Sequence, residues 1–156
     1  MISDLEVIVR LALAVLLGGL VGLEREVKGR AAGFRTHILV CIGSALVMLT
    51  SVFLTGKTGN LDTHMAAQVV SGIGFLGAGT IIQFRDSIRG LTTAASVWAS
   101  AGLGLAVGAG FYVGAVSATL IVLIVLFALG GVERRLGAKG KAYPWADGPE
   151  AKSVRR

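Results

Sequence analysis

Long runs of apolar residues, separated by short polar turns, dominate this sequence. A helix needs about 20 residues to cross the roughly 30 Å hydrocarbon core of a bilayer. Lipid offers no partner to backbone polar groups, so such a segment is expected to be helical. Only 15% of the residues are charged, whereas about 25% is typical of soluble domains. We therefore predict an all-α integral membrane protein with five transmembrane helices, at residues 5–23, 34–54, 65–82, 92–107 and 111–129.

The basic residues predict how these helices are oriented. All 15 Lys and Arg residues except Arg10 and Lys57 lie in or beside the first loop, the third loop or the C-terminal segment. Positive charge gathers on the cytoplasmic side of membrane proteins, so we expect the N-terminus outside and the C-terminus inside. Residues 1–130 would then form the transmembrane domain, and residues 131–156 a short basic cytoplasmic tail. This distribution favours the lipid bilayer as partner and argues against nucleic acid.

The third and fourth segments are rich in small residues. Between residues 66 and 80, most positions are Gly, Ala, Ser or Thr. Small residues let membrane helices approach closely, so we expect these two helices at the centre of the bundle. A tandem repeat of a helical hairpin is also visible at a fixed spacing, in which Gly22, Gly33 and Thr36 correspond to Gly79, Gly90 and Thr93.

Ionisable residues cluster where the first two segments meet the first cytoplasmic turn. Glu24 and Arg25 end one segment, and Arg35, Thr36 and His37 begin the next. Ionisable groups at membrane depth are candidates for function. Two interpretations stay open. The arginines could reach the lipid headgroups while Glu24 pairs with one of them, or the cluster could bind a ligand.

A second polar cluster surrounds the start of the fourth segment and contains Asp86, Arg89, Thr92 and Thr93. Thr92 is expected to cap the fourth helix. If the two hairpins face each other, this cluster meets Glu24 and Arg35 at a cytoplasmic mouth, as a small vestibule or as a salt-bridged rim. Carboxylates suit Mg²⁺, so Glu24 and Asp86 are the candidate metal ligands.

A glycine-rich run in the third segment contains Gln68, Ser71, Gly72, Gly74, Gly77 and Gly79. Its spacing fits G-x-G-x-x-G, but a dinucleotide site needs a preceding strand and a later acidic residue. Here the run lies inside an apolar segment, and residues 91–101 contain no acid. The run then indicates either close helix packing, with Gln68 and Ser71 bonding across helices, or a broken helix whose carbonyls coordinate a cation.

Two GxxxG pairs, Gly18 with Gly22 and Gly104 with Gly108, are further packing and dimerisation signals. Nothing in the sequence indicates an enzyme. The single cysteine, Cys41, cannot form an internal disulfide, and His37 and His64 are expected on opposite membrane faces. We therefore expect no catalytic residues and no organic cofactor.

Four stretches together resemble the MgtC/SapB family of bacterial inner-membrane proteins: residues 22–25 (GLER), 32–37 (AGFRTH), 68–79 (QVVSGIGFLGAG) and 89–95 (RGLTTAA). The resemblance covers about residues 10–130. It implies a multi-helix domain of the bacterial inner membrane that is linked to growth at low magnesium. Some members are linked to survival inside host cells and to restraint of the membrane ATP synthase. Some carry Asn where this chain has Thr92, which weakens the transfer of any partner contact made there.

The resemblance also bears on the C-terminal soluble domain of the family and on the function of this chain. Longer members add a C-terminal soluble domain, which we expect to be absent here. Our favoured hypothesis is a regulator in magnesium homeostasis that acts through helix–helix contacts with other membrane proteins, such as the membrane sector of the ATP synthase. The alternative is a Mg²⁺ transporter or channel. We also expect a homodimer that forms through glycine faces.

Overall fold

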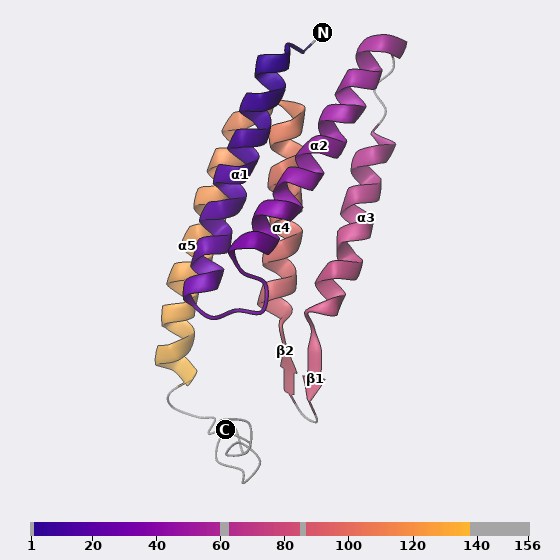
Figure 1. Ribbon diagram of the computed structural model, residues 1–156. Helices are drawn as coiled ribbons and strands as arrows, with labels where there is room; N and C mark the ends of the chain where they lie inside the picture. Colours follow the sequence, from indigo (N-terminus) through magenta and orange to yellow (C-terminus); the bar gives the residue numbers. More distant parts are fainter. Residues whose placement is uncertain (1, 60–62, 85–86, 138–156) are drawn as a thin grey trace. The chain divides into compact units, whose positions relative to one another are not determined.

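The computed structural model describes residues 2–59, 63–84 and 87–137, with side chains described through residue 128 except at 58, 84 and 87. It contains five helices: α1 (Asp4–Val27), α2 (Phe34–Thr58), α3 (His64–Gly79), α4 (Leu91–Ala109) and α5 (Tyr112–Gly137). The chain divides into two compact units, Met1–Leu123 and Ile124–Arg156. The first unit is a bundle of α1 to α4 with the first part of α5 (Figure 1).

Five helices are confirmed, and three of them are long and apolar enough to cross a membrane: Asp4–Val27, Phe34–Lys57 and Leu91–Ala109. Helix α3 has 16 residues, which at about 1.5 Å per residue is shorter than the roughly 30 Å hydrocarbon core. The apolar described part of α5, Tyr112–Ala128, is also short of the usual length. Five complete crossings, their orientation and the tandem repeat therefore stay predictions.

A small β-hairpin links α3 to α4 where the sequence indicated only a loop. Strands β1 (Ile82–Phe84) and β2 (Ser87–Arg89) pair antiparallel, with Gln83 opposite Ile88. β-branched and aromatic residues favour extended backbone, which accounts for these short strands. Gly90 then starts α4 with a φ of +91°, a conformation that favours glycine. The expectation that Thr92 caps α4 is wrong, because the cap position is Gly90.

Helix α2 packs between α1 and α4 through the two GxxxG pairs. A Cβ atom added at Gly18 would lie 2.7 Å from the Cβ of Cys41, and one at Gly108 would lie 2.6 Å from the backbone oxygen of Ala45. Glycine is therefore required for these close approaches. Both pairs are used inside the chain, against the same helix, rather than left open for dimerisation.

Helix α3 lies at the edge of the bundle, so the expectation that it is central is wrong. Its buried residues are Ile73 and Gly77. Ile73 packs with Ala32, Val97 and Ala101 in a small core. The reason is that α1 and α4 already cover the faces of α2, which they approach closely at their glycines. Small residues permit close packing, but the sequence does not say whether the neighbour belongs to the same chain.

Candidate functional site

A buried ion cluster closes the end of α1 beside the α1–α2 loop. The Glu24 and Arg25 residues are only 4% and 2% exposed. Arg25 Nε lies 2.5 Å from Glu24 Oε2, and Lys28 Nζ lies 2.6 Å from Glu24 Oε1. Charges that leave water need close partners to offset their lost hydration. Two cations share one carboxylate here, so the cluster carries a net positive charge.

The neighbouring Glu26 has a different role, which sequence reasoning missed. Its Oε2 atom accepts a hydrogen bond of 3.0 Å from the backbone N–H of Phe34, the first residue of α2. Gly33 precedes that residue and has no side chain with which to cap the helix. A carboxylate at a helix N-terminus satisfies a free N–H group and complements the helix dipole. Glu26 therefore fixes the start of α2.

His37 connects α2 to α4 in the interior of the bundle. The residue is fully buried. Its Nδ1 atom lies 2.8 Å from the backbone oxygen of Gly33, and its Nε2 atom lies 3.0 Å from Ser96 Oγ. The Ser96 hydroxyl in turn donates to the backbone oxygen of Thr93 at 2.9 Å. The absence of a side chain at Gly22 makes room for this histidine, because a Cβ there would lie 3.0 Å from the Cβ of His37.

The other residues of the predicted cytoplasmic mouth have different positions. Thr93 is buried, whereas Arg35, Thr36, Arg89 and Thr92 are exposed. Asp86 lies outside the described residues. The structure therefore joins Glu24 to Arg25 and Lys28, and the convergence of these groups with Arg35, Asp86 and Arg89 stays a prediction.

The glycine-rich run forms an unbroken helix from His64 to Gly79. Gly77 is buried, and a Cβ there would lie 3.6 Å from that of Ala94 on α4. The remaining positions that were predicted to pack are exposed: Gln68, Ser71, Gly72, Gly74 and Gly79. An added Cβ at Gly72, Gly74 or Gly79 would meet nothing within 4 Å. The continuous helix disagrees with the interpretation of a broken helix. Gln68 Nε2 lies 3.3 Å from His64 Nε2 on the same helix, and the hydrogen bonds of Gln68 and Ser71 across helices stay a prediction.

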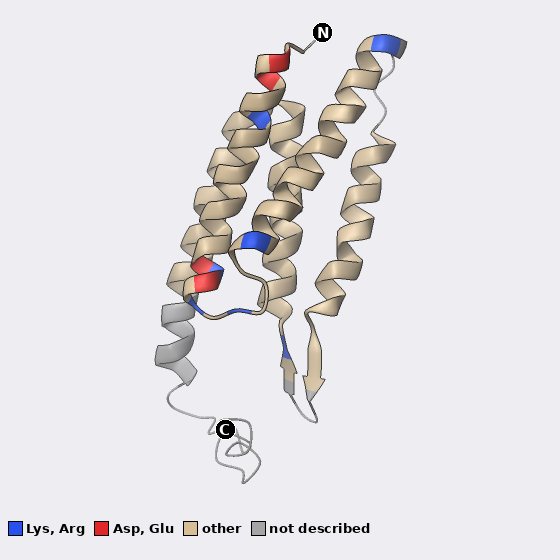
Figure 2. Cartoon of the chain, viewed as in Figure 1, with Lys and Arg blue, Asp and Glu red and all other residues tan. Residues whose placement is uncertain are grey.

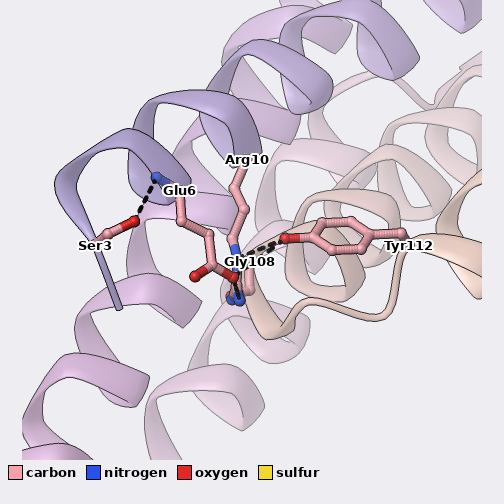
Figure 3. Close-up of polar contacts among 5 residues, drawn as sticks. All are labelled: Ser3, Glu6, Arg10, Gly108 and Tyr112. Carbon is pink, nitrogen blue, oxygen red and sulfur yellow. Dashed lines mark hydrogen bonds and ion pairs between the residues drawn. The ribbon is translucent and has the colours of Figure 1, made fainter. Parts of the chain in front are cut away.

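An arginine network ties α1 to the α4–α5 turn at the opposite end of the bundle (Figure 3). Arg10 Nε donates to Tyr112 Oη at 2.9 Å, and Nη1 donates to the backbone oxygen of Gly108 at 2.7 Å. Its Nη2 atom pairs with Glu6. The spacing of four residues accounts for the Glu6–Arg10 pair. Nothing in the sequence signals the contacts to Tyr112 and Gly108, which are about 100 residues away in the chain.

Metal-binding chemistry finds limited support in this arrangement. In the part of the chain that the structure describes, no three His, Cys, Asp or Glu side chains come together to hold an ion. Glu24, one of the two candidate ligands, already pairs with Arg25 and Lys28. A dication bound there would have to displace these cations or bind against their charge.

The family profile described as "MgtC family" matches residues 11–135, which include the ion cluster, His37 and the whole of α3. The chain belongs to the MgtC family. The resemblance inferred from the four sequence stretches is thereby confirmed. Membership of the family also supports the broader expectation of a membrane protein related to magnesium.

Three curated relatives illustrate the similarity. The chain is 47% identical to "Protein MgtC" of Brucella abortus over 74% of its own length and 48% of the relative. It is 42% identical to "Putative magnesium transporter YhiD" of Escherichia coli, over 78% of this chain and 59% of the relative. It is 39% identical to "Protein SapB" of Bacillus subtilis, over 86% and 61%. The chain therefore spans about half to three fifths of these relatives. No solved structure matches it.

Proposed function

We propose that this chain is a multi-pass protein of the bacterial inner membrane that acts in magnesium homeostasis by regulating another membrane protein through helix–helix contacts. The magnesium role is supported by membership of the MgtC family and by the name of the Escherichia coli relative. Because the chain covers only part of its relatives, their activity transfers to it only as a proposal.

The proposed orientation is supported by the charges at the two ends of the bundle (Figure 2). Arg25 lies in the last turn of α1 and Arg35 in the first turn of α2. Lys28 and Arg30 lie in the turn between these helices, and Arg89 lies in the hairpin before α4. At the other end, Arg10 is neutralised by Glu6, and Lys57 is exposed. The positive-inside tendency favours a cytoplasmic location for the α1–α2 end.

The observation that carries the regulatory mechanism is the open face of α3, which we define as Ala67, Ser71, Gly74 and Ala78. All four residues are exposed. Their spacing of four, three and four residues places them along one side of a helix. Small residues at such spacing allow another membrane helix to approach closely. Elsewhere in the bundle the chain uses its own glycines for this kind of contact, at Gly18, Gly22, Gly104 and Gly108.

The partner on this face is proposed to be a helix of another membrane protein, for which the membrane sector of the ATP synthase is the candidate implied by the family resemblance. A second copy of this chain is the other candidate. Co-purification of two differently tagged copies from mild detergent distinguishes them. Recovery of both tags together supports the homodimer, and recovery of one tag with a different membrane protein supports regulation.

Leucine substitutions test the mechanism directly. We expect Gly74→Leu to abolish the support of growth at limiting magnesium, because the side chain blocks close approach to α3. The matched control is Gly43→Leu on α2, since a Cβ at Gly43 also meets nothing within 4 Å. Both variants should reach the membrane in normal amounts. Full growth with Gly74→Leu, or equal loss with both variants, would contradict the mechanism.

Transport of Mg²⁺ is the alternative function, and the printed name of the Escherichia coli relative favours it. Mg²⁺ is bound by oxygen ligands and retains several waters, so Glu24 would be the natural ligand near the cytoplasmic end. Proteoliposomes that contain the protein should then take up Mg²⁺, and Glu24→Gln should abolish the uptake. Uptake no greater than that of empty liposomes would rule the transporter out.

A further inference from the structure

The contacts of His37 leave one hydrogen atom shared between two acceptors. A backbone carbonyl only accepts hydrogen bonds, so the 2.8 Å contact with Gly33 requires a proton on His37 Nδ1. In the neutral imidazole, Nε2 is then an acceptor. Ser96 Oγ lies 3.0 Å from this Nε2 and 2.9 Å from the backbone oxygen of Thr93. The hydroxyl carries a single proton, so it can satisfy only one of them at a time.

A proton added to Nε2 resolves this competition. The imidazolium donates from Nδ1 to Gly33 and from Nε2 to Ser96, while the Ser96 hydroxyl turns to Thr93. Each of these three hydrogens then has its own acceptor at the distances that the structure shows. The added proton comes from water and forms one N–H bond, and no other covalent bond changes. Buried polar groups are stable when every donor is paired.

The charged surroundings of the imidazole come from α1 and α2. Burial deprives a protonated imidazole of hydration, and Glu24 and Arg25 on α1 act on it electrostatically with opposite signs. On α2 itself, Arg35 is exposed and Cys41 is buried one turn further into the bundle. Helix α4, which supplies the serine, contains no ionisable side chain between Leu91 and Ala109. The Glu24 carboxylate is itself paired with Arg25 and Lys28.

We propose that His37, Ser96 and the Gly33 carbonyl form an internal proton-binding site between α2 and α4. Proton binding strengthens the connection between the two helices, because it converts two competing contacts into a continuous chain from Gly33 to Thr93. None of its three residues belongs to the open face of α3 or is a candidate metal ligand. It remains in place whether the protein regulates a partner or transports an ion.

Nitrogen NMR of the imidazole tests the proposal in the full-length protein. The chain has two histidines, so His64→Gln leaves His37 as the single ¹⁵N-histidine signal in lipid nanodiscs. Above its titration we expect the tautomer with hydrogen on Nδ1. Between about pH 8 and about pH 5 we expect a reversible change to imidazolium. A neutral ring throughout this range, or hydrogen on Nε2 alone at high pH, would overturn the proposal.

Two serine variants separate the site from general packing effects. Ser96→Ala removes the acceptor for the Nε2 hydrogen and should weaken proton binding by about tenfold to a hundredfold, as expected for a hydrogen bond to a charged group. Ser100→Ala is the matched control, because Ser100 is buried one turn further along α4 and its hydroxyl has no hydrogen-bond partner among the described residues. It should leave the titration unchanged. Equal titrations for both variants would show that Ser96 takes no part in proton binding.

Discussion

Arg10 lies within the first apolar segment, yet almost all of its surface is buried by groups from three helices. Its guanidinium occupies the end of α4, where backbone carbonyls lack helical partners. The Gly108 oxygen accepts from it at 2.7 Å. A cation at a helix C-terminus also interacts favourably with the helix dipole. This one side chain therefore stabilises the turn that joins α4 to α5.

Replacing Arg10 by Leu should lower the free energy of unfolding by about 2–3 kcal/mol, since hydrogen bonds to a charged group are lost and the Gly108 oxygen is left without this donor. Tyr112→Phe removes only the hydroxyl that accepts from Arg10 and should lower it by about 1 kcal/mol. Denaturant unfolding in a mild detergent, followed by circular dichroism, measures both changes. Equal effects of the two substitutions would contradict the central place of Arg10.

At the same scale, residue types predicted one ion pair of the candidate site. Glu24 stood out because a carboxylate ended an apolar segment, and it does pair with Arg25 as one interpretation held. Lys28 was missed although it follows Glu24 by four residues, a spacing that brings side chains together on a helix. Glu26 was missed because its partner, the N–H of Phe34, depends on how the turn after α1 folds back. The contact of His37 with Ser96 crosses 59 residues. Residue spacing along a sequence does not reveal a contact of that kind.

The helices are held together by glycines at specific positions rather than by a general abundance of small residues. Gly104 faces α2 so closely that an added Cβ would overlap the backbone oxygen of Cys41, whereas Gly102 on the same helix faces open space. The two glycines are only two residues apart, so they lie on nearly opposite sides of α4.

This pair gives a matched test of packing. Gly104→Ala should lower the free energy of unfolding by about 1–3 kcal/mol, because a well-packed interface tolerates added volume poorly. Gly102→Ala should leave stability unchanged or raise it by up to about 1 kcal/mol, since alanine favours helix more than glycine does. Unfolding of both variants in the same detergent measures the difference. A similar change in both would mean that the α2–α4 interface is not close-packed at Gly104.

The length and hydropathy of the segments predicted the elements better than their arrangement. Each apolar segment corresponds to one of the five helices, because segment length and hydropathy are local properties. Helices α1, α2 and α5 extend beyond the predicted ends, to Val27, Thr58 and Gly137. The third segment was expected to reach residue 82, but the helix ends at Gly79 and Ile82 begins a strand. The peripheral position of α3 could not be predicted, since small residues serve contacts within and between chains equally well.

Across the whole molecule, close packing is concentrated in three of the helices. Helices α1, α2 and α4 form the compact part, and they contain most of the buried residues. Helix α3 leaves Phe75 83% exposed, and a Cβ atom added at Gly72, Gly74 or Gly79 would meet nothing within 4 Å. In a bilayer these surfaces would face lipid or another helix. Regulation of a membrane partner and transport of an ion both require that the bundle crosses a membrane, and the proposed orientation places its α1–α2 turn in the cytoplasm.

Cysteine accessibility in intact cells tests that central claim most directly. In a Cys41→Ala background, single cysteines replace the exposed Lys57 and the exposed Arg30, which lie at opposite ends of α2 and its preceding loop. A membrane-impermeant maleimide should label Lys57→Cys in spheroplasts, and should label Arg30→Cys only after the membrane is permeabilised. Labelling of both cysteines from the same side would contradict the proposed crossing.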